Sequence, residues 1–290
     1  GKEVHDEALV NADLPKVIFA LGIMGTRDMK FLWENIVRVS NANGAFASGD
    51  TACGFANTAM VLAHKGFIPN VFAAVVRVAS VARTLAAYEA GAVGPNKDCG
   101  YEGVYCKAIA GIPIAMEGKS AACAHLSPVG NIAACVADLW SNESVQPVRL
   151  LSDIAPVVSI EQLIYDCRLM NEAKNQGFGV KFRDLLADSD AKFDPQAYVL
   201  RPDVVFDISK ELVKIKTPYL RTKYGAKLAI DILKKAVAKN EVLIQEREKS
   251  WLDILDEQLA TVPDDEEKFW HEIKGELELD KFIPSEYDLK

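Results

Sequence analysis

The chain has few cysteines for its length, six in 290 residues. They are too sparse and too irregularly spaced for a disulfide scaffold, so we expect free or metal-bound thiols and a cytoplasmic protein. Long uncharged apolar runs are also missing, because the longest apolar stretch, 71–93, is interrupted by Arg77, Arg83 and Glu89. A bilayer span needs about 20 mostly uncharged residues, so no membrane segment is expected.

An excess of basic residues is absent as well. The net charge is -8, and a nucleic-acid partner is not expected because binding phosphates needs a basic surface. The glycines of residues 22–25 lack the GxGxxG spacing, and no GxxxxGK[ST] loop occurs. Residues 1–10 do not resemble a secretory signal, and since residue 1 is Gly we expect the true start upstream.

Residues 1–156 show short apolar runs alternating with helical patterns. Strands are predicted at 16–22, 44–48 and 112–116, and helices from near Asp28 and over 56–65, 72–89, 101–110 and 129–139. A helix after each strand predicts a parallel sheet or barrel. The predicted fold class is α/β, of the (β/α)8 TIM barrel family, with this chain covering the later βα units because only three or four are found.

Residues 157–290 instead have the pattern of long, charged, amphipathic helices. These are predicted over 159–175, 194–213, 219–239, 243–260 and 264–276, with starts at Asp194-Pro195 and Pro263-Asp264. Opposite charges three and four residues apart indicate solvated helix faces. We expect this helical extension to serve packing and oligomerisation rather than chemistry.

Two glycine-rich loops bring an Asp and a Cys close together. They are GDTAC at 49–53 and GPNKDCGYE at 94–102. Loops at the carboxyl ends of barrel strands line the active site, so Cys53 and Cys99 could meet there and bind Zn²⁺ through soft thiolates. Spacing alone leaves open that both are ordinary free thiols, because no CxxC pair occurs.

The remaining cysteines and histidines are weaker candidates. Three cysteines are expected to pack within helices, namely Cys106, Cys135 and Cys167. Cys123 and His125 could line a pocket wall. A triad with Cys99 and His125 lacks a recognisable base or oxyanion hole. The other histidines are expected on polar or helical surfaces, namely His5, His64 and His271.

Four segments carry a family resemblance, namely SGDTAC, YEAGAVGPNKDCGYE, MEGKSAACAH and WSNESV. They closely resemble the substrate-activating zinc subunit of the methanol:corrinoid methyltransferases, and the resemblance runs from Gly1 to near Tyr287. It implies a TIM barrel with zinc held by one Glu and two Cys, which fall on Cys53 and Cys99. The Glu is expected upstream of Gly1, and neither Glu3 nor Glu7 matches its position.

The resemblance also implies a reaction and partners. Zinc would act as a Lewis acid on the oxygen of methanol, and the methyl group would pass to Co(I) of a corrinoid carried by a separate corrinoid protein. A homodimer within a larger complex is expected. Asp50, Asp98 and Glu102 would orient the zinc ligands, although Asp50 and Asp98 are equally suited to cap the helices that follow.

Two other functions remain open. The first is a corrinoid-linked methyltransferase for another small methyl donor, such as a methoxylated compound. The second is a non-catalytic assembly subunit or inactive fragment, in which the helical part mediates dimerisation. Metal content would separate the second from either enzyme.

Overall fold

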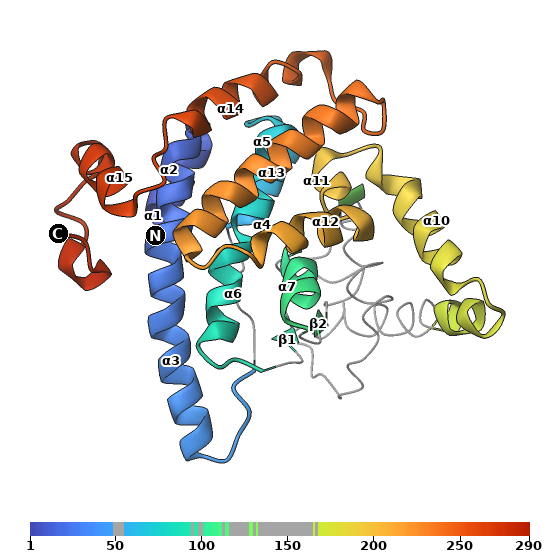
Figure 1. Cartoon of the computed structure of the whole chain (residues 1–290), viewed down its shortest axis with the longest axis horizontal. Helices are drawn as coiled ribbons and strands as arrows, with labels where there is room; N and C mark the ends of the chain where they lie inside the picture. Colours follow the sequence, from blue (N-terminus) through green and yellow to red (C-terminus); the bar gives the residue numbers. More distant parts are fainter. Residues whose placement is uncertain are drawn as a thin grey trace.

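The computed structural model describes residues 1–48, 55–93, 96–97, 101–111, 114–115, 128–129, 132, 165 and 168–290. Most of these residues are helical (Figure 1). The strands among them are β1 (Asn96–Lys97) and β2 (Ile114–Ala115), which pair in parallel. The part of the chain that the structure describes is therefore an assembly of packed helices.

The N-terminal helices follow one another with short connections. They are α1 (Lys2–Val10), α2 (Leu14–Phe19), the π-helix η1 (Ala20–Gly25) and α3 (Thr26–Ala42). The Asp13 side chain accepts a hydrogen bond from the Lys16 amide at the start of α2, where Pro15 occupies the first turn. An acidic cap followed by proline is a strong helix start.

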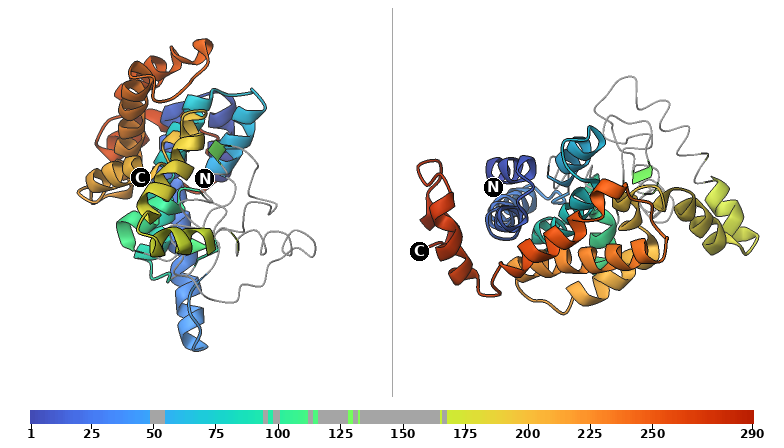
Figure 2. Two further views of the ribbon diagram at one scale, coloured as in Figure 1. Left: turned by 90° about the vertical axis from the view of Figure 1, so that its right-hand side faces the viewer. Right: turned by 90° about the horizontal axis from the view of Figure 1, so that it is seen from above.

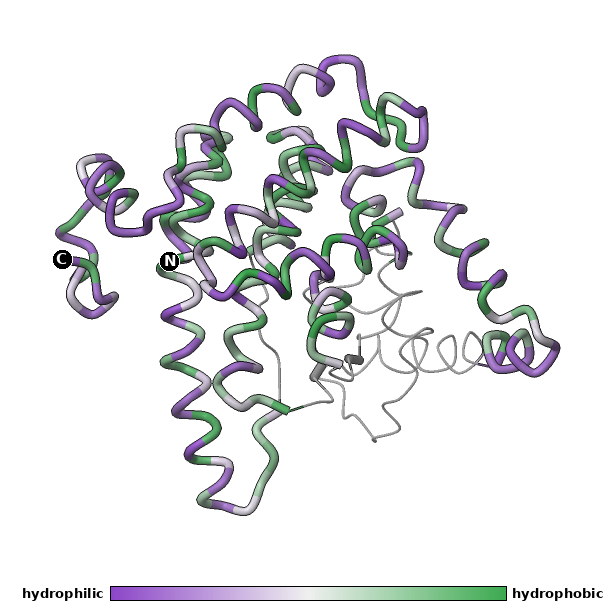
Figure 3. The backbone as a smooth tube through the Cα atoms, viewed as in Figure 1, coloured by the Kyte–Doolittle hydropathy of each residue, from purple (hydrophilic) through white to green (hydrophobic). Residues whose placement is uncertain are grey.

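The centre of the molecule is built around α5. The helices here are α4 (Ala56–His64), α5 (Asn70–Ala79), α6 (Val81–Glu89) and α7 (Gly103–Ala110). All residues of α5 from Val71 to Ala79 are buried. The tube in Figure 3 is green along much of this central region and more mixed along α3 and α15, as expected when an inner helix is enclosed on every side.

The C-terminal helices surround this centre. They are α10 (Gly179–Ala191), α11 (Pro195–Tyr198), α12 (Pro202–Leu212), α13 (Pro218–Ala238), α14 (Trp251–Ala260) and α15 (Glu266–Ile273), with short 3-10 turns η3 (Glu246–Glu248), η4 (Lys274–Glu276) and η5 (Pro284–Tyr287). Helix α13 packs closely on α5, because Gly225 leaves room for the Val78 carbonyl, which would lie 3.3 Å from an added Cβ.

One hydrophobic core includes residues from both parts of the chain, from Ala8 to Leu289. Figure 2 shows α15 and the C-terminus beside the N-terminal helices. The contact is specific, since Tyr287 donates a 2.7 Å hydrogen bond to Asp28 and the Trp270 ring stacks on Phe19. The division at residues 156 and 157 stays a prediction.

The predicted α/β fold class, a (β/α)8 TIM barrel, is wrong for the described residues. The 16–22 run lies in α2 and η1, and residues 45–48 have no regular structure, whereas the described residues of the predicted 112–116 strand, Ile114 and Ala115, do form a strand. A short apolar run that is buried all round looks the same in a helix and in a strand. The Asp13 cap and Pro15 were the local signals that favoured a helix at 16–22.

The helix predictions agree better with the structure. Helices α3, α4, α7 and α13 are confirmed near their predicted positions, and the predicted 72–89 helix is divided into α5 and α6 at Ser80. Residues 70–89 are long and apolar enough to cross a membrane by length and composition, yet 89% of the apolar window is buried inside the protein. These two helices are core elements of the fold. The predicted 129–139 helix lies largely outside the described residues.

Candidate functional site

Most of the predicted site residues lie outside the described residues. These are Asp50, Cys53, Asp98 and Cys99, together with Cys123, His125, Cys135 and Cys167. Glu102 is described, and it lies in a buried polar cluster. Within the described ranges, no group of three His, Cys, Asp or Glu side chains is placed to hold a metal.

Glu102 and Arg77 form a buried ion pair. Arg77 of α5 is 0% exposed and Glu102, just before α7, is 1% exposed. The Arg77 Nη1 atom lies 3.6 Å from Glu102 Oε2, and the Thr84 hydroxyl of α6 donates to Glu102 Oε1 at 3.4 Å. Removing two charges from water is costly, so their mutual attraction and the hydrogen bond from Thr84 must offset the desolvation.

Arg77 also reaches two other chain segments. Its Nη2 donates to the Ala56 carbonyl oxygen at 3.3 Å and to Gln196 Oε1 at 3.4 Å, and its Nη1 donates to Asn57 Oδ1 at 3.2 Å. The guanidinium carbon lies 5.2 Å from the centre of the Tyr101 ring. One side chain therefore joins α5, the start of α4, the start of α7 and α11.

Burial and charge act in opposite directions on this pair. Burial raises the pKa of Glu102, while the neighbouring Arg77 and Arg83 charges lower it. Burial also lowers the pKa of Arg77, and the Glu102 carboxylate opposes that change. A guanidinium stays protonated in proteins, so Arg77 is a fixed buried cation beside Glu102.

A second cation lies beside Phe55. The guanidinium carbon of Arg83 is 3.8 Å from the centre of the Phe55 ring, and the His5 ring centre is 5.0 Å from it. Arg83 passes over Gly25, where an added Cβ would lie 2.9 Å from Arg83 Cδ. The π-helix η1 thus presents a glycine where the arginine needs room.

His5 is completely buried, and the prediction of a surface position is wrong. On α1 it shares a face with Ala8 and Leu9, three and four residues on, which are also buried. Burial lowers the pKa of His5 to about 4, so the imidazole is neutral at pH 7. The i, i+3, i+4 spacing was the signal for a core position.

The other described candidates have no place in the cluster. Cys106 is buried in the core on α7, as expected for helix packing. His64 is partly exposed and lies 3.4 Å from Asp194, and His271 is exposed. Arg77 and Thr84 were missed as site residues, although an arginine in an otherwise apolar run was the available signal.

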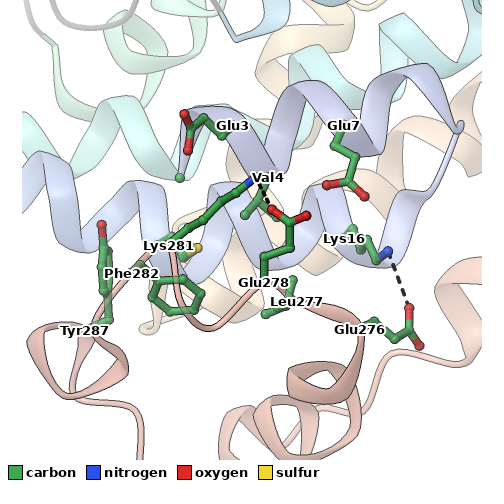
Figure 4. Close-up of a pocket in the computed structure, with 12 residues that line it drawn as sticks. Glu3, Val4, Glu7, Lys16, Glu276, Leu277, Glu278, Lys281, Phe282 and Tyr287 are labelled. Carbon is green, nitrogen blue, oxygen red and sulfur yellow. Dashed lines mark ion pairs between the residues drawn. The ribbon is translucent and has the colours of Figure 1, made fainter.

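A separate cleft of about 170 Å³ lies between α1 and the C-terminal segment (Figure 4). Glu3 and Glu7 line one side and are exposed. Two ion pairs join its other charged groups, Lys16–Glu276 and Lys281–Glu278. Exposed carboxylates and ion pairs of this kind are typical of a solvated surface, so the cleft is part of the protein surface.

Comparisons with known proteins agree with one another. A family model described as the methanol-cobalamin methyltransferase B subunit matches residues 1–288. A methanol–corrinoid protein co-methyltransferase from Methanosarcina barkeri is 38% identical over 294 residues, which cover 99% of this chain and 63% of the relative. The crystal structure of the methanol:cobalamin methyltransferase complex MtaBC from Methanosarcina barkeri matches with a TM-score of 0.86 and 37% identity, covering 99% of this chain and 64% of that one.

The chain thus spans a little under two thirds of the length of these relatives. The matched residues 1–288 contain the whole region over which the sequence segments resembled the family. The resemblance is confirmed.

Proposed function

Because the chain belongs to the methanol-cobalamin methyltransferase B subunit family, we propose that it takes part in transferring the methyl group of methanol to a corrinoid cobalt. The observation that carries the proposal is 38% identity across 99% of the chain to a methanol–corrinoid protein co-methyltransferase. A match of this length favours a reaction that the chain shares with its relative. The two cysteine loops would then serve that reaction.

The proposed metal ligands are Cys53 and Cys99, with a Glu expected upstream of Gly1. Two thiolates and a carboxylate are a donor set that suits zinc and leaves a fourth position for substrate. The described residues that follow the two cysteines are compatible with a shared metal site. In the sequence, Cys53 lies three residues before Ala56 and Cys99 lies three residues before Glu102. Arg77 contacts both Ala56 and Glu102, which supports two loops that converge.

The roles proposed for the chain's own residues follow from this arrangement. Cys53 and Cys99 hold the metal as thiolates, while Asp50, Asp98 and Glu102 orient the segments that carry them. Thr84 and Arg77 fix the Glu102 carboxylate. Bound zinc supplies Lewis acidity to the methanol oxygen, which otherwise makes a poor leaving group.

The proposed partners are a separate corrinoid protein and a second copy of the chain within a larger complex. Methyl transfer needs the corrinoid face to approach the bound methanol, so the rim of the site must be a protein interface. The reducing, cytoplasmic compartment expected from the cysteine content belongs to the same proposal.

The test is methyl transfer from methanol to Co(I) corrinoid on its carrier protein, followed by the change in the corrinoid absorption spectrum. We expect methyl-Co(III) to form with methanol and with zinc present. Faster transfer from a methoxylated donor would favour the related methyltransferase. No transfer from any donor by a zinc-loaded chain would favour an assembly subunit and reject the proposal.

A further inference from the structure

The Arg77 side chain is a junction between segments that are distant in sequence. It donates hydrogen bonds to the Ala56 carbonyl, Asn57 and Gln196 at 3.2 to 3.4 Å, and it forms an ion pair with the Glu102 carboxylate at 3.6 Å. The Asn57 and Gln196 contacts are separated from Arg77 by 20 and 119 residues along the chain. The regular structure in the described parts of these segments is helical, so no β-sheet hydrogen bonds join them in place of the Arg77 contacts.

The chemistry of the junction depends on the planar guanidinium. A fork of five N–H donors serves several acceptors in fixed directions, whereas a lysine ammonium is a compact point charge. A buried ion pair is weak support for stability, and apolar side chains of similar size are often as stable. The arrangement is therefore better explained by positioning than by stability alone.

We propose that Arg77 is a positioning residue that holds the chain entering α4 and the chain entering α7 at a fixed separation. The inference rests on the proposed function in one respect, because these two segments follow Cys53 and Cys99. In that setting the guanidinium sets the distance between the two metal-binding loops, and metal affinity depends on its shape as well as its charge. Gln196 extends the same junction to α11, since its side chain also donates to Asn70 at 3.4 Å.

A purely structural role would give a different result. If Arg77 only stabilises the core, a variant that stays folded should bind metal as the wild type does. If it positions the loops, metal affinity should fall in a folded variant. Changes of partners around metal ligands typically reduce metal affinity about 10- to 100-fold.

The experiment compares Arg77→Lys with wild type by titration with Zn²⁺ and with Co²⁺, whose thiolate charge-transfer absorption reports sulfur ligation. Folding of each chain is checked by circular dichroism. The matched control is Arg27→Lys, since Arg27 also joins segments, contacting Glu266 and the Tyr287 carbonyl, but outside the cluster. We expect a 10- to 100-fold weaker affinity for Arg77→Lys and no change for Arg27→Lys.

Wild-type affinity and an unchanged cobalt spectrum in folded Arg77→Lys would overturn the inference. If Arg77→Lys does not fold, Asn57→Ala decides, because it removes one acceptor and leaves the buried charges paired. Reduced affinity in that variant supports positioning, and wild-type affinity contradicts it.

A metal-free measurement separates this inference from the proposed function. If the wild-type chain binds no metal, the proposed zinc site fails. Positioning is then judged by oxidation with diamide, which can join Cys53 and Cys99 only when their Cα atoms are within about 7 Å. A disulfide that forms in wild type and is lost in Arg77→Lys supports the inference, and equal yields in the two chains, or none in either, overturn it.

Discussion

The buried His5 should make the protein sensitive to mild acid. Burial lowers its pKa from 6.5 to about 4 in the folded chain. Between these pH values the unfolded chain binds the proton and the folded chain does not, so stability is present above pH 6.5 and is lost as the pH falls toward 4. For this shift the free energy of unfolding falls by about 2 kcal/mol between pH 7.5 and pH 5.

The assay is urea unfolding at pH 7.5 and pH 5 on wild type and on His5→Gln. Gln cannot titrate, so the variant should lack about 2 kcal/mol of the pH dependence, whatever its stability at pH 7.5. His271→Gln is the control for replacing a histidine, because His271 is exposed on α15. An equal loss of stability in wild type and His5→Gln would refute the reasoning.

Three further predictions concern stability and are measured by urea unfolding at pH 7.5. Glu102→Gln leaves the Arg77 charge buried without its partner and should lower the free energy of unfolding by roughly 3–5 kcal/mol. Asp203→Asn, at an exposed ion pair, should lower it by less than about 1 kcal/mol. Similar losses in the two variants would contradict the buried ion pair. Gly25→Ala places a Cβ 2.9 Å from the Ala20 carbonyl oxygen and should lower the free energy of unfolding by about 1–3 kcal/mol. Unchanged stability would show that η1 can accommodate the added methyl group. Asp194→Ala removes the cap of α11 and should cost about 1 kcal/mol; no loss would mean that the cap is dispensable.

The helices were largely predictable because their signals are local. Apolar spacing and caps such as Asp194-Pro195 act within one or two turns, and α11 begins where they indicated, although the predicted 194–213 helix is divided into α11 and α12. The helix predicted from Asp264 begins two residues later, at Glu266, because Asp265 provides the cap of α15. A shift of two residues at the start leaves the apolar spacing of the helix unchanged.

The strands predicted at 16–22 and 44–48 are wrong for a physical reason, whereas the described part of the 112–116 strand is β2. Parallel strands pair across long sequence separations, and a short apolar run does not reveal whether a partner strand exists. The 16–22 run had helical caps beside it, and weighing them against the alternation of elements would have corrected the prediction. The pairing that is present, β1 with β2, includes two residues that had been expected in a loop.

The candidate site was predictable only in part. The closeness of Glu102 to Cys99 in the sequence predicts a site residue, and Glu102 lies in the buried cluster. The role of Arg77 could not be inferred, because its partners at Asn57 and Gln196 come from other helices. In the sequence the arginine is visible as a charge within an apolar run, which indicates the absence of a membrane span but not the partners of the side chain.

The most direct test of the account is zinc per chain, measured by elemental analysis. The samples are this 290-residue chain, a version extended upstream to include the expected Glu, and Cys53→Ala, Cys99→Ala and Cys106→Ala in whichever version holds metal. The account predicts one zinc in the parent and in Cys106→Ala, and loss of most zinc from the other two variants. One zinc retained by both Cys53→Ala and Cys99→Ala, or none in either parent, would contradict it.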